Sequence, residues 1–564
     1  MDLSMKKVFF FLPLLTSFFL FGEAPSEPIS KIQIVYLMQA EEFDKALTLY
    51  TQYKKEIGHH DFEVLSQLAQ IILDQDAKST DPERQLLSIF GAGIGGITSS
   101  FDLLTNTIVS RNPQVQMASI QILSEMQDDR ADEILTKAMA SDFFPIRMEA
   151  AFQLSSRKHR KACGYIESLM YKLPPQMRFL FPQFFALIGT KEAISLLKHM
   201  MGDKEMSTRI EATLNAAKFG RDDLLPIIRA KATHLNIPEQ EASASALGFL
   251  KDSKSIPKLK MLAKSPASNV KLAALRSLHL LGDTSFDQEI IEMAKTNDIF
   301  AIASLGSIND SEEVLLELLR SKDLQVKFNA AIALLEKKDR RCLSALLEIL
   351  VRDMSDIAFF PTQSIGRSLS AWKVIPSAKH HLKEYPYDIY SVSLSFREHV
   401  LKSSMQLNEN DFLILAEHIF ESKQTELVPL LVRLLENLQT PKAIKLLQNK
   451  AQKAGAPLIR TYCTLGCFRL KQEGGYENAL KEWITQQKNN EMIRFKEALP
   501  FDIRLKDTSF ELTPDDSARL LIESYQALSD RHEEECIDIL IKALQGGNPK
   551  NRCVIAGLIL KSTT

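Results

Sequence analysis

The sequence predicts an all-α protein, an α-solenoid built from stacked antiparallel helix pairs. The prediction rests on the length of the chain, its few turn residues and one recurring amphipathic pattern. The 564 residues exceed what a single compact core accommodates, which leaves several domains or one extended array. With 21 glycines and 22 prolines, the chain has too few turn residues for a large sheet protein, because every hairpin needs its own turn.

The recurring pattern is a helix opening that pairs an apolar with a polar or basic residue, followed by small residues. Copies begin at Ile146, Thr208 and Val270, each separated by twice a spacing of about 31 residues. The copy at Val326 comes sooner, so one unit in between has lost several residues. Apolar residues of a copy fall on one helical face, and a polar break suited to capping the next helix follows. Each unit is therefore a helix pair that hides its apolar face only against its neighbours.

These features resemble the HEAT repeat, especially its short PBS-lyase HEAT-like form. The likeness rests on the opening pair, the alanine-rich first helix, breaks such as Gly282-Asp283, and leucine-rich second helices such as Val314–Leu319. It covers roughly Asn112 to Asp353, or about eight units. The resemblance implies an armadillo-like superhelix with a long concave surface.

In such repeats the basic residue often pairs with an acidic residue near the preceding turn. The resemblance therefore implies pairs of Asp142 with Arg147, Asp203 with Arg209, and Asp323 with Lys327. Lys271 is the basic residue of a further copy. We expect this ladder to be structural, and an exposed ligand-binding ridge is the alternative.

The rest of the chain divides around this array. Phrases such as Glu42–Tyr50 and Tyr476–Trp483 resemble the second helix of a tetratricopeptide repeat. Residues 354–410 have poor periodicity and more aromatic residues. The predicted segments are a signal peptide or hydrophobic anchor at 1–24, TPR-like helical hairpins at 29–111, the HEAT-like array at 112–353, an irregular, mostly helical insertion at 354–410, and divergent C-terminal helical repeats at 411–564.

The amino terminus has the form of a secretory signal, because Lys6 and Lys7 precede an apolar run from Val8 to Phe21. We expect an exported bacterial protein of the periplasm or envelope. The cleavage site is poorly defined, since Pro25 would follow a cut after Ala24. An uncleaved anchor, and with it a membrane association, stays open.

Motifs that carry chemistry are incomplete. Gly91 to Gly96 has dinucleotide-site spacing, but a helix precedes it where a strand is needed, so Gly91 and Gly95 predict close helix packing instead. Cys463 and Cys467 lie four apart on one helix, without the spacing of a zinc site, and are expected in the core. No catalytic, cofactor-binding or metal-ligating residue is predicted.

The function that follows is a non-catalytic scaffold for protein–protein interaction with unknown partners. A net charge of −2 without long basic runs argues against nucleic acid. Two alternatives stay open. One is a tetrapyrrole-lyase-like or other enzyme built on such repeats, and the other is a membrane-anchored envelope protein or secreted effector.

Overall fold

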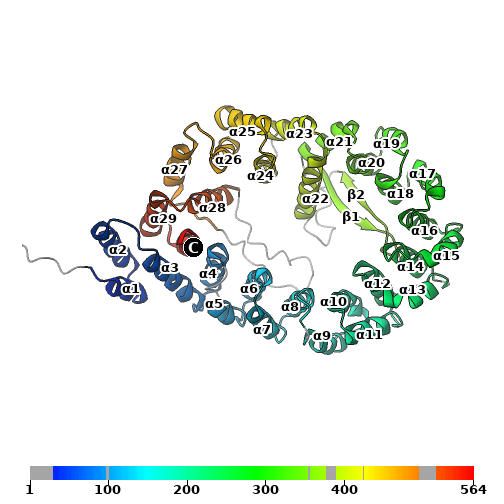
Figure 1. Cartoon of the computed structure of the whole chain (residues 1–564), viewed down its shortest axis with the longest axis horizontal. Coiled ribbons are helices and arrows are strands. Elements are labelled where there is room, and N and C mark those ends of the chain that lie inside the picture. The colour runs from blue at the N-terminus through cyan, green and yellow to red at the C-terminus, as the bar shows by residue number, and fades with distance from the viewer. Residues whose placement is uncertain are drawn as a thin grey trace, which may run out of the picture.

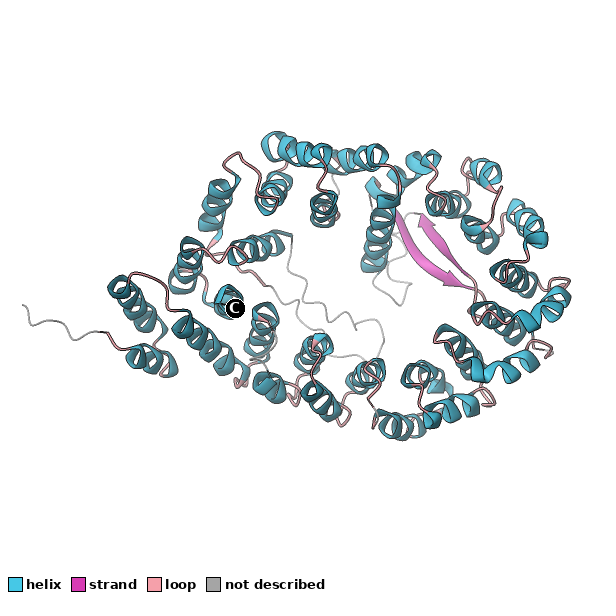
Figure 2. Cartoon of the chain, in the orientation of Figure 1, coloured by secondary structure: helices cyan, strands magenta, loops and turns pink. Residues whose placement is uncertain are grey.

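The chain forms a closed ring of helices in the computed structural model (Figure 1). The structure describes residues 29–96, 101–159, 161–234, 236–353, 356–376, 389–422, 425–493 and 516–563. One hairpin apart, the described elements are helical (Figure 2). The predicted all-α solenoid is therefore confirmed.

The array over 112–353 consists of eight stacked helix pairs among its described residues, as the repeat spacing predicts. The first helix of each pair faces the middle of the ring and the second lies outside it (Figure 1). In chain order the elements are α6 (Pro113–Glu125) with α7 (Asp129–Ala138), α8 (Phe144–Ser156) with α9 (Ala162–Tyr171), η1 (Pro175–Leu180) and α10 (Pro182–Ile188) with α11 (Lys191–Met200), α12 (Met206–Lys218) with α13 (Leu225–Lys231), α14 (Ile237–Phe249) with α15 (Ile256–Leu262), α16 (Ser268–Leu280) with α17 (Asp287–Lys295), α18 (Ile299–Ser304) with α19 (Glu312–Leu318), and α20 (Leu324–Glu336) with α21 (Leu343–Val351). The pair α18 and α19 is the shortened unit.

Caps at the breaks explain where the helices start and stop. Gly189 ends α10 with a φ of 67°, which glycine adopts without strain. Thr190 then accepts a hydrogen bond from the backbone N–H of Ala193 and starts α11. Asp128 caps α7 in the same way. The polar breaks between the two helices of a unit therefore do the capping that the sequence predicts.

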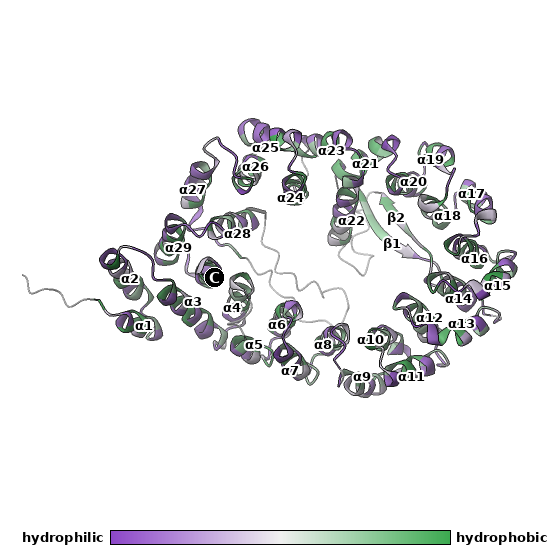
Figure 3. Ribbon diagram, viewed as in Figure 1, coloured by the Kyte–Doolittle hydropathy of each residue, from purple (hydrophilic) through white to green (hydrophobic). Residues whose placement is uncertain are grey.

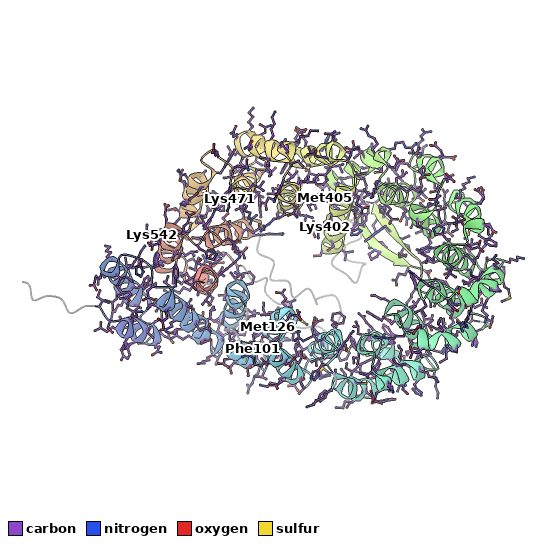
Figure 4. The ribbon with its side chains drawn as sticks, in the orientation of Figure 1. Phe101, Met126, Lys402, Met405, Lys471 and Lys542 are labelled. Carbon is purple, nitrogen blue, oxygen red and sulfur yellow. The ribbon has the colours of Figure 1, made fainter. Side chains whose placement is uncertain are left out.

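The segment 354–410 corrects an expectation, because its described part begins with a β-hairpin instead of helix. Strands β1 (Ile357–Gln363) and β2 (Ser370–Pro376) pair antiparallel, with Ile357 opposite Pro376 and Gln363 opposite Ser370. Only then does α22 (Ile389–Ser403) follow. The strands are rich in aromatic and β-branched residues, and Figure 3 shows them as largely hydrophobic. Buried Ile357, Phe359 and Val374 join the main core.

Helical pairs also build the two flanks. The N-terminal helices are α1 (Lys31–Gln39), α2 (Phe43–Ile57), α3 (Phe62–Ala77), α4 (Pro82–Gly95) and α5 (Phe101–Thr107). The C-terminal helices are α23 (Glu409–Glu421), α24 (Val428–Leu438), α25 (Pro441–Lys453), α26 (Pro457–Arg469), α27 (Tyr476–Gln487), α28 (Asp516–Ser529), α29 (Glu534–Gly546) and α30 (Arg552–Thr563). The helical nature of both flanks is as predicted.

The ring closes where α30 packs against α3 and α4, and α29 packs against α2. We call this contact the seam. Helix α30 is buried on all sides, from Cys553 through Leu560, as expected of a helix that is apolar all round. One connected core runs from Ile34 to Leu560, so the first and last described helices share it.

Candidate binding surface

The hairpin lies on the inner face of the array, against α18 and α20, with α22 behind β1 (Figure 1). Asn329 of α20 is almost fully buried and binds the backbone of Trp372 on both sides. Its Nδ2 donates to the Trp372 carbonyl at 2.7 Å, and its Oδ1 accepts from the Trp372 N–H at 3.0 Å. An inner helix thus uses a side-chain amide to hold a strand by its main chain.

Aromatic rings fix the hairpin between α20 and α22. The Phe359 ring lies 5.6 Å from Phe328 of α20 and 4.6 Å from Phe396 of α22. Trp372 also packs against Phe396, at 4.1 Å between ring centroids. Such contacts add directional packing to the burial of the rings. The hairpin is therefore held mainly by apolar contacts, and a few hydrogen bonds fix its position relative to α20.

The turn of the hairpin reaches α14, where Glu241 is fully buried. The Glu241 carboxylate accepts hydrogen bonds from the Ser364 hydroxyl, the Gly366 N–H at 3.0 Å and the Ser368 hydroxyl at 2.8 Å. A side chain at Gly366 would lie 2.7 Å from the Pro238 carbonyl oxygen, so glycine is needed for this approach. Three donors compensate for burying the charge.

Arg367 extends the contact of the turn to two more units. Its Nη1 lies 2.7 Å from Oε1 of Glu211 on α12, and its guanidinium lies over the Phe179 ring of η1 at 5.4 Å. One extended segment of the chain therefore spans the inner face from α20 to η1.

The ladder residues lie at the helix starts, but their partners differ from those expected. Arg147 donates to the Ser141 carbonyl at 2.6 Å, and Asp142 is exposed and forms no ion pair with it. Arg209 donates to the carbonyl oxygen of Asp203, at 2.8 Å, instead of to its carboxylate. The Asp203 carboxylate accepts from the Glu205 N–H and faces Arg178 at 3.4 Å. Neither predicted acid therefore pairs with its base, which corrects the first two predicted pairs.

The remaining ladder residues also have partners that the sequence does not predict. Asp323 caps α20 by accepting from the Gln325 N–H, so Lys327 pairs with Glu348 of α21 instead. Lys271 pairs with Glu289 of α17 at 2.7 Å. The structural role that we predict for these bases fits their contacts, but the acids come from later helices, which sequence spacing alone does not reveal.

One cluster of ion pairs links two neighbouring units of the array. Glu239 at the start of α14 is buried and contacts Arg209 of α12 and Lys231 of α13. Burial raises the pKa of the Glu239 carboxyl, but the Arg209 and Lys231 cations outweigh that effect and hold the pKa below its usual value. The carboxylate is therefore charged at neutral pH.

Charged groups also meet at the seam. Lys54 of α2 lies 2.7 Å from Oδ1 of Asp538 on α29. The buried His60 ring places Nδ1 3.0 Å from the Tyr50 hydroxyl and Nε2 3.2 Å from the same Asp538 oxygen. Burial lowers the pKa of His60, and Lys54 lowers it further, against the attraction of Asp538. The imidazole is therefore neutral at neutral pH.

The thiols lie in the core. All six cysteines are free and buried, as predicted for Cys463 and Cys467. Burial raises the pKa of Cys467 to about 12 and of Cys536 to about 11, so neither is a thiolate at neutral pH. In the part of the chain that the structure describes, no group of three or more His, Cys, Asp and Glu side chains is arranged to hold a metal ion. A helix long and apolar enough to cross a membrane is likewise not found among the described residues.

Sequence reasoning missed Glu241 and Asn329, which hold the hairpin. A signal was present at Glu241, because it opens the run Glu241–Ala246 of otherwise alanine and serine. An acid buried in the most closely packed first helix needs donors from elsewhere. The sequence does not say that those donors lie more than 100 residues away.

Comparisons with known proteins found one family model and several solved structures that are similar to this chain. The family model for HEAT repeats matches residues 193–279, from α11 into α16. The complex of CpcE and CpcF of phycocyanin lyase from Nostoc sp. PCC7120 is similar at 17% identity over 38% of this chain and 92% of that one, with a TM-score of 0.29. The karyopherin Kap121p bound to the SUMO protease Ulp1p has 11% identity over 93% and 62% of the two chains and a TM-score of 0.41. UNC-45 from Drosophila melanogaster has 12% identity over 91% and 76%, with a TM-score of 0.30. No curated protein matches the sequence.

Proposed function

We propose that this chain, a HEAT-repeat protein, is an exported scaffold that binds other proteins and catalyses nothing. The observation that carries the proposal is the seating of the hairpin on the inner face. Asn329 and Glu241 bind it partly through backbone N–H and C=O groups, which any polypeptide offers. A surface that holds one extended segment in this way has the chemistry to hold another from a partner.

The state of the titratable groups supports a non-catalytic role. Glu241 is engaged by three donors of the hairpin, and Glu239 is neutralised by two cations of its own chain. Burial raises the pKa of Cys342 to about 12, so its thiol is a poor nucleophile at neutral pH. These groups have structural partners and are not poised to transfer protons.

Crosslinking from the inner face tests the scaffold function. A photo-crosslinking amino acid at Ile365, which is 71% exposed at the hairpin turn, samples the middle of the ring. The matched control carries it at Glu313, exposed on the outer helix α19. We expect Ile365 to crosslink, in the native cell, to a protein that mass spectrometry identifies and that then binds the purified chain. Equal crosslinking from both positions, or no binding by the purified chain, would reject an inner binding face.

Export rests on the first 24 residues, which lie outside the described part of the chain. The positive charges of Lys6 and Lys7 before the apolar run from Val8 to Phe21 support it. Sequencing the amino terminus of the protein isolated from its own cells tests the proposal. A terminus beyond Phe21 is expected, whereas an intact Met1 or Met5 in a cytoplasmic fraction would contradict it.

A further inference from the structure

A cavity of about 340 Å³ lies at the second unit of the array, between the turn that precedes α8 and the end of α9. Arg147 enters it from α8, and Tyr165 and Lys172 enter it from α9 and the residue after it. Met139 and Asp142 line the turn side. The cavity thus combines two cations, one anion, an aromatic ring and an apolar wall.

The two cations lack an acidic partner among the described residues. Arg147 donates only to the Ser141 carbonyl, and its buried Nε has no hydrogen-bond partner. Lys172 is exposed and forms no ion pair within 4.0 Å with a described residue. Leaving a buried guanidinium nitrogen without a hydrogen-bond partner is costly, so an acceptor that reaches this cavity would be bound favourably.

The equivalent place two units later shows which group fits such a site. There, the Glu239 carboxylate contacts Arg209, and His234, at the position of Lys172, places Nδ1 3.4 Å from Glu239 Oε2. Lys231 lies 3.3 Å from the other carboxylate oxygen. Glu239 is the third residue of α14, and the third residue of the corresponding helix η1 is Met177. The second unit therefore keeps the arginine, has Lys172 at the position of His234, and has a methionine where the acid would be.

Asp142 does not fill the gap. It forms no ion pair with Arg147, although both line the cavity. At the equivalent turn, the Asp203 carboxylate accepts from the Glu205 N–H, and Glu239 still contacts both Arg209 and Lys231. An aspartate at this turn is thus compatible with a second carboxylate next to the arginine.

We propose that this cavity binds the carboxylate of an aspartate or glutamate side chain on a partner protein. Arg147 and Lys172 take the carboxylate, and Met139 and the Tyr165 ring, which is 45% exposed, cover the carbon atoms behind it. The site rests on the proposed scaffold function, which it deepens by naming the chemistry of the partner. A partner with an exposed acidic residue fits, and one with only basic residues there does not.

Methyl NMR tests the site directly, because Met139 lines the cavity. The full chain is labelled with methyl-¹³C methionine and titrated at constant ionic strength with N-acetyl-glutamate N-methylamide. N-acetyl-glutamine N-methylamide is the uncharged match. We expect a saturable shift of the Met139 signal with the glutamate probe only. Arg147→Gln and Lys172→Gln should each weaken binding at least tenfold, whereas the exposed Arg320→Gln should leave it unchanged.

Several results would overturn the assignment. One is an equal response of the Met139 signal to both probes, and another is binding that survives both Arg147→Gln and Lys172→Gln. A third is succinate binding more than tenfold tighter than the glutamate probe, because that would indicate a small-molecule site. Using two separate variants guards against a folding defect in one of them. An inner-face partner found without probe binding rejects the cavity alone. Probe binding without any partner rejects the scaffold and keeps the carboxylate site.

Discussion

Gly91 of α4 and Gly557 of α30 meet backbone to backbone at the seam. A Cβ on either residue would overlap the main chain of the other helix, at the carbonyl of Cys553 or of Gly91 itself. Gly95, one turn on, also faces α30 but less closely, since a Cβ there would lie 3.0 Å from the Gly557 carbonyl oxygen. The close packing that the sequence predicts for Gly91 and Gly95 is confirmed, and its partner is the last helix of the chain.

Replacing Gly557 with leucine should open the ring. The side chain cannot be accommodated without separating α30 from α4, and overpacking of this kind costs about 1–3 kcal/mol, occasionally more. Small-angle X-ray scattering should show a larger maximum dimension, and thermal unfolding a lower Tm. Gly546→Ala is the control, because no atom lies within 4 Å of a Cβ there. An unchanged scattering curve for Gly557→Leu would contradict the seam.

The seam should weaken in mild acid because of His60. Its pKa is below the ordinary 6.5 in the closed ring, chiefly through burial, so an opened seam binds a proton that the closed one does not. Closure is therefore insensitive to pH above about 6.5 and loses stability as the pH falls below that value. Urea unfolding at pH 7.5 and pH 5.5 measures the loss.

The His60→Gln variant should lose less stability than the parent chain over the same pH interval. The exposed His418→Gln serves as the matched control and should behave like the parent. Equal losses in all three proteins would show that His60 does not couple closure to protonation.

Glu241→Gln should release the hairpin turn without unfolding the array. A glutamine presents an amide nitrogen to groups that are themselves donors, and an unsatisfied buried group costs about 1–3 kcal/mol. Hydrogen exchange should accelerate over residues 364–369, while α14 stays protected. Glu125→Gln, at an exposed position on α6, should have no effect. Unchanged exchange at the turn would mean that Glu241 does not hold it.

The thiols should be unreactive until the protein unfolds. All six are buried, and burial raises the pKa of Cys536, for example, to about 11. With a disulfide reagent at pH 8, the native chain should react at essentially none of them, and the guanidinium-unfolded chain at all six. Rapid reaction of a native thiol would identify a region that opens locally.

Periodic features were predictable because they are local. At the break Gly189-Thr190, the glycine ends one helix and the threonine caps the next. The spacing of the copies from Ile146 to Val270 gives the length of one unit. Such signals depend on neighbours a few positions away. They recur in every unit, so weakness in one copy is compensated by the others.

The hairpin and the ladder partners depend on contacts that sequence does not contain. An isolated two-stranded hairpin is only marginally stable in water. The hairpin of β1 and β2 is stabilised by its hydrogen bonds to Asn329 and Glu241. Likewise, Lys327 pairs with Glu348 of the next helix because Asp323 is occupied by capping. The unfilled cavity at Arg147 became visible only by comparison with Arg209 in three dimensions.

The burial of α30 between α3 and α4 also sets the order in which the molecule can be completed. Most repeat arrays can form unit by unit during translation, since each layer needs only its neighbour. Here the apolar sides of α3 and α4 are covered by α30, which the ribosome makes after every other described helix. In a nascent chain those sides therefore stay exposed until α30 has been made, and deleting residues 552–563 would destabilise the N-terminal helices first.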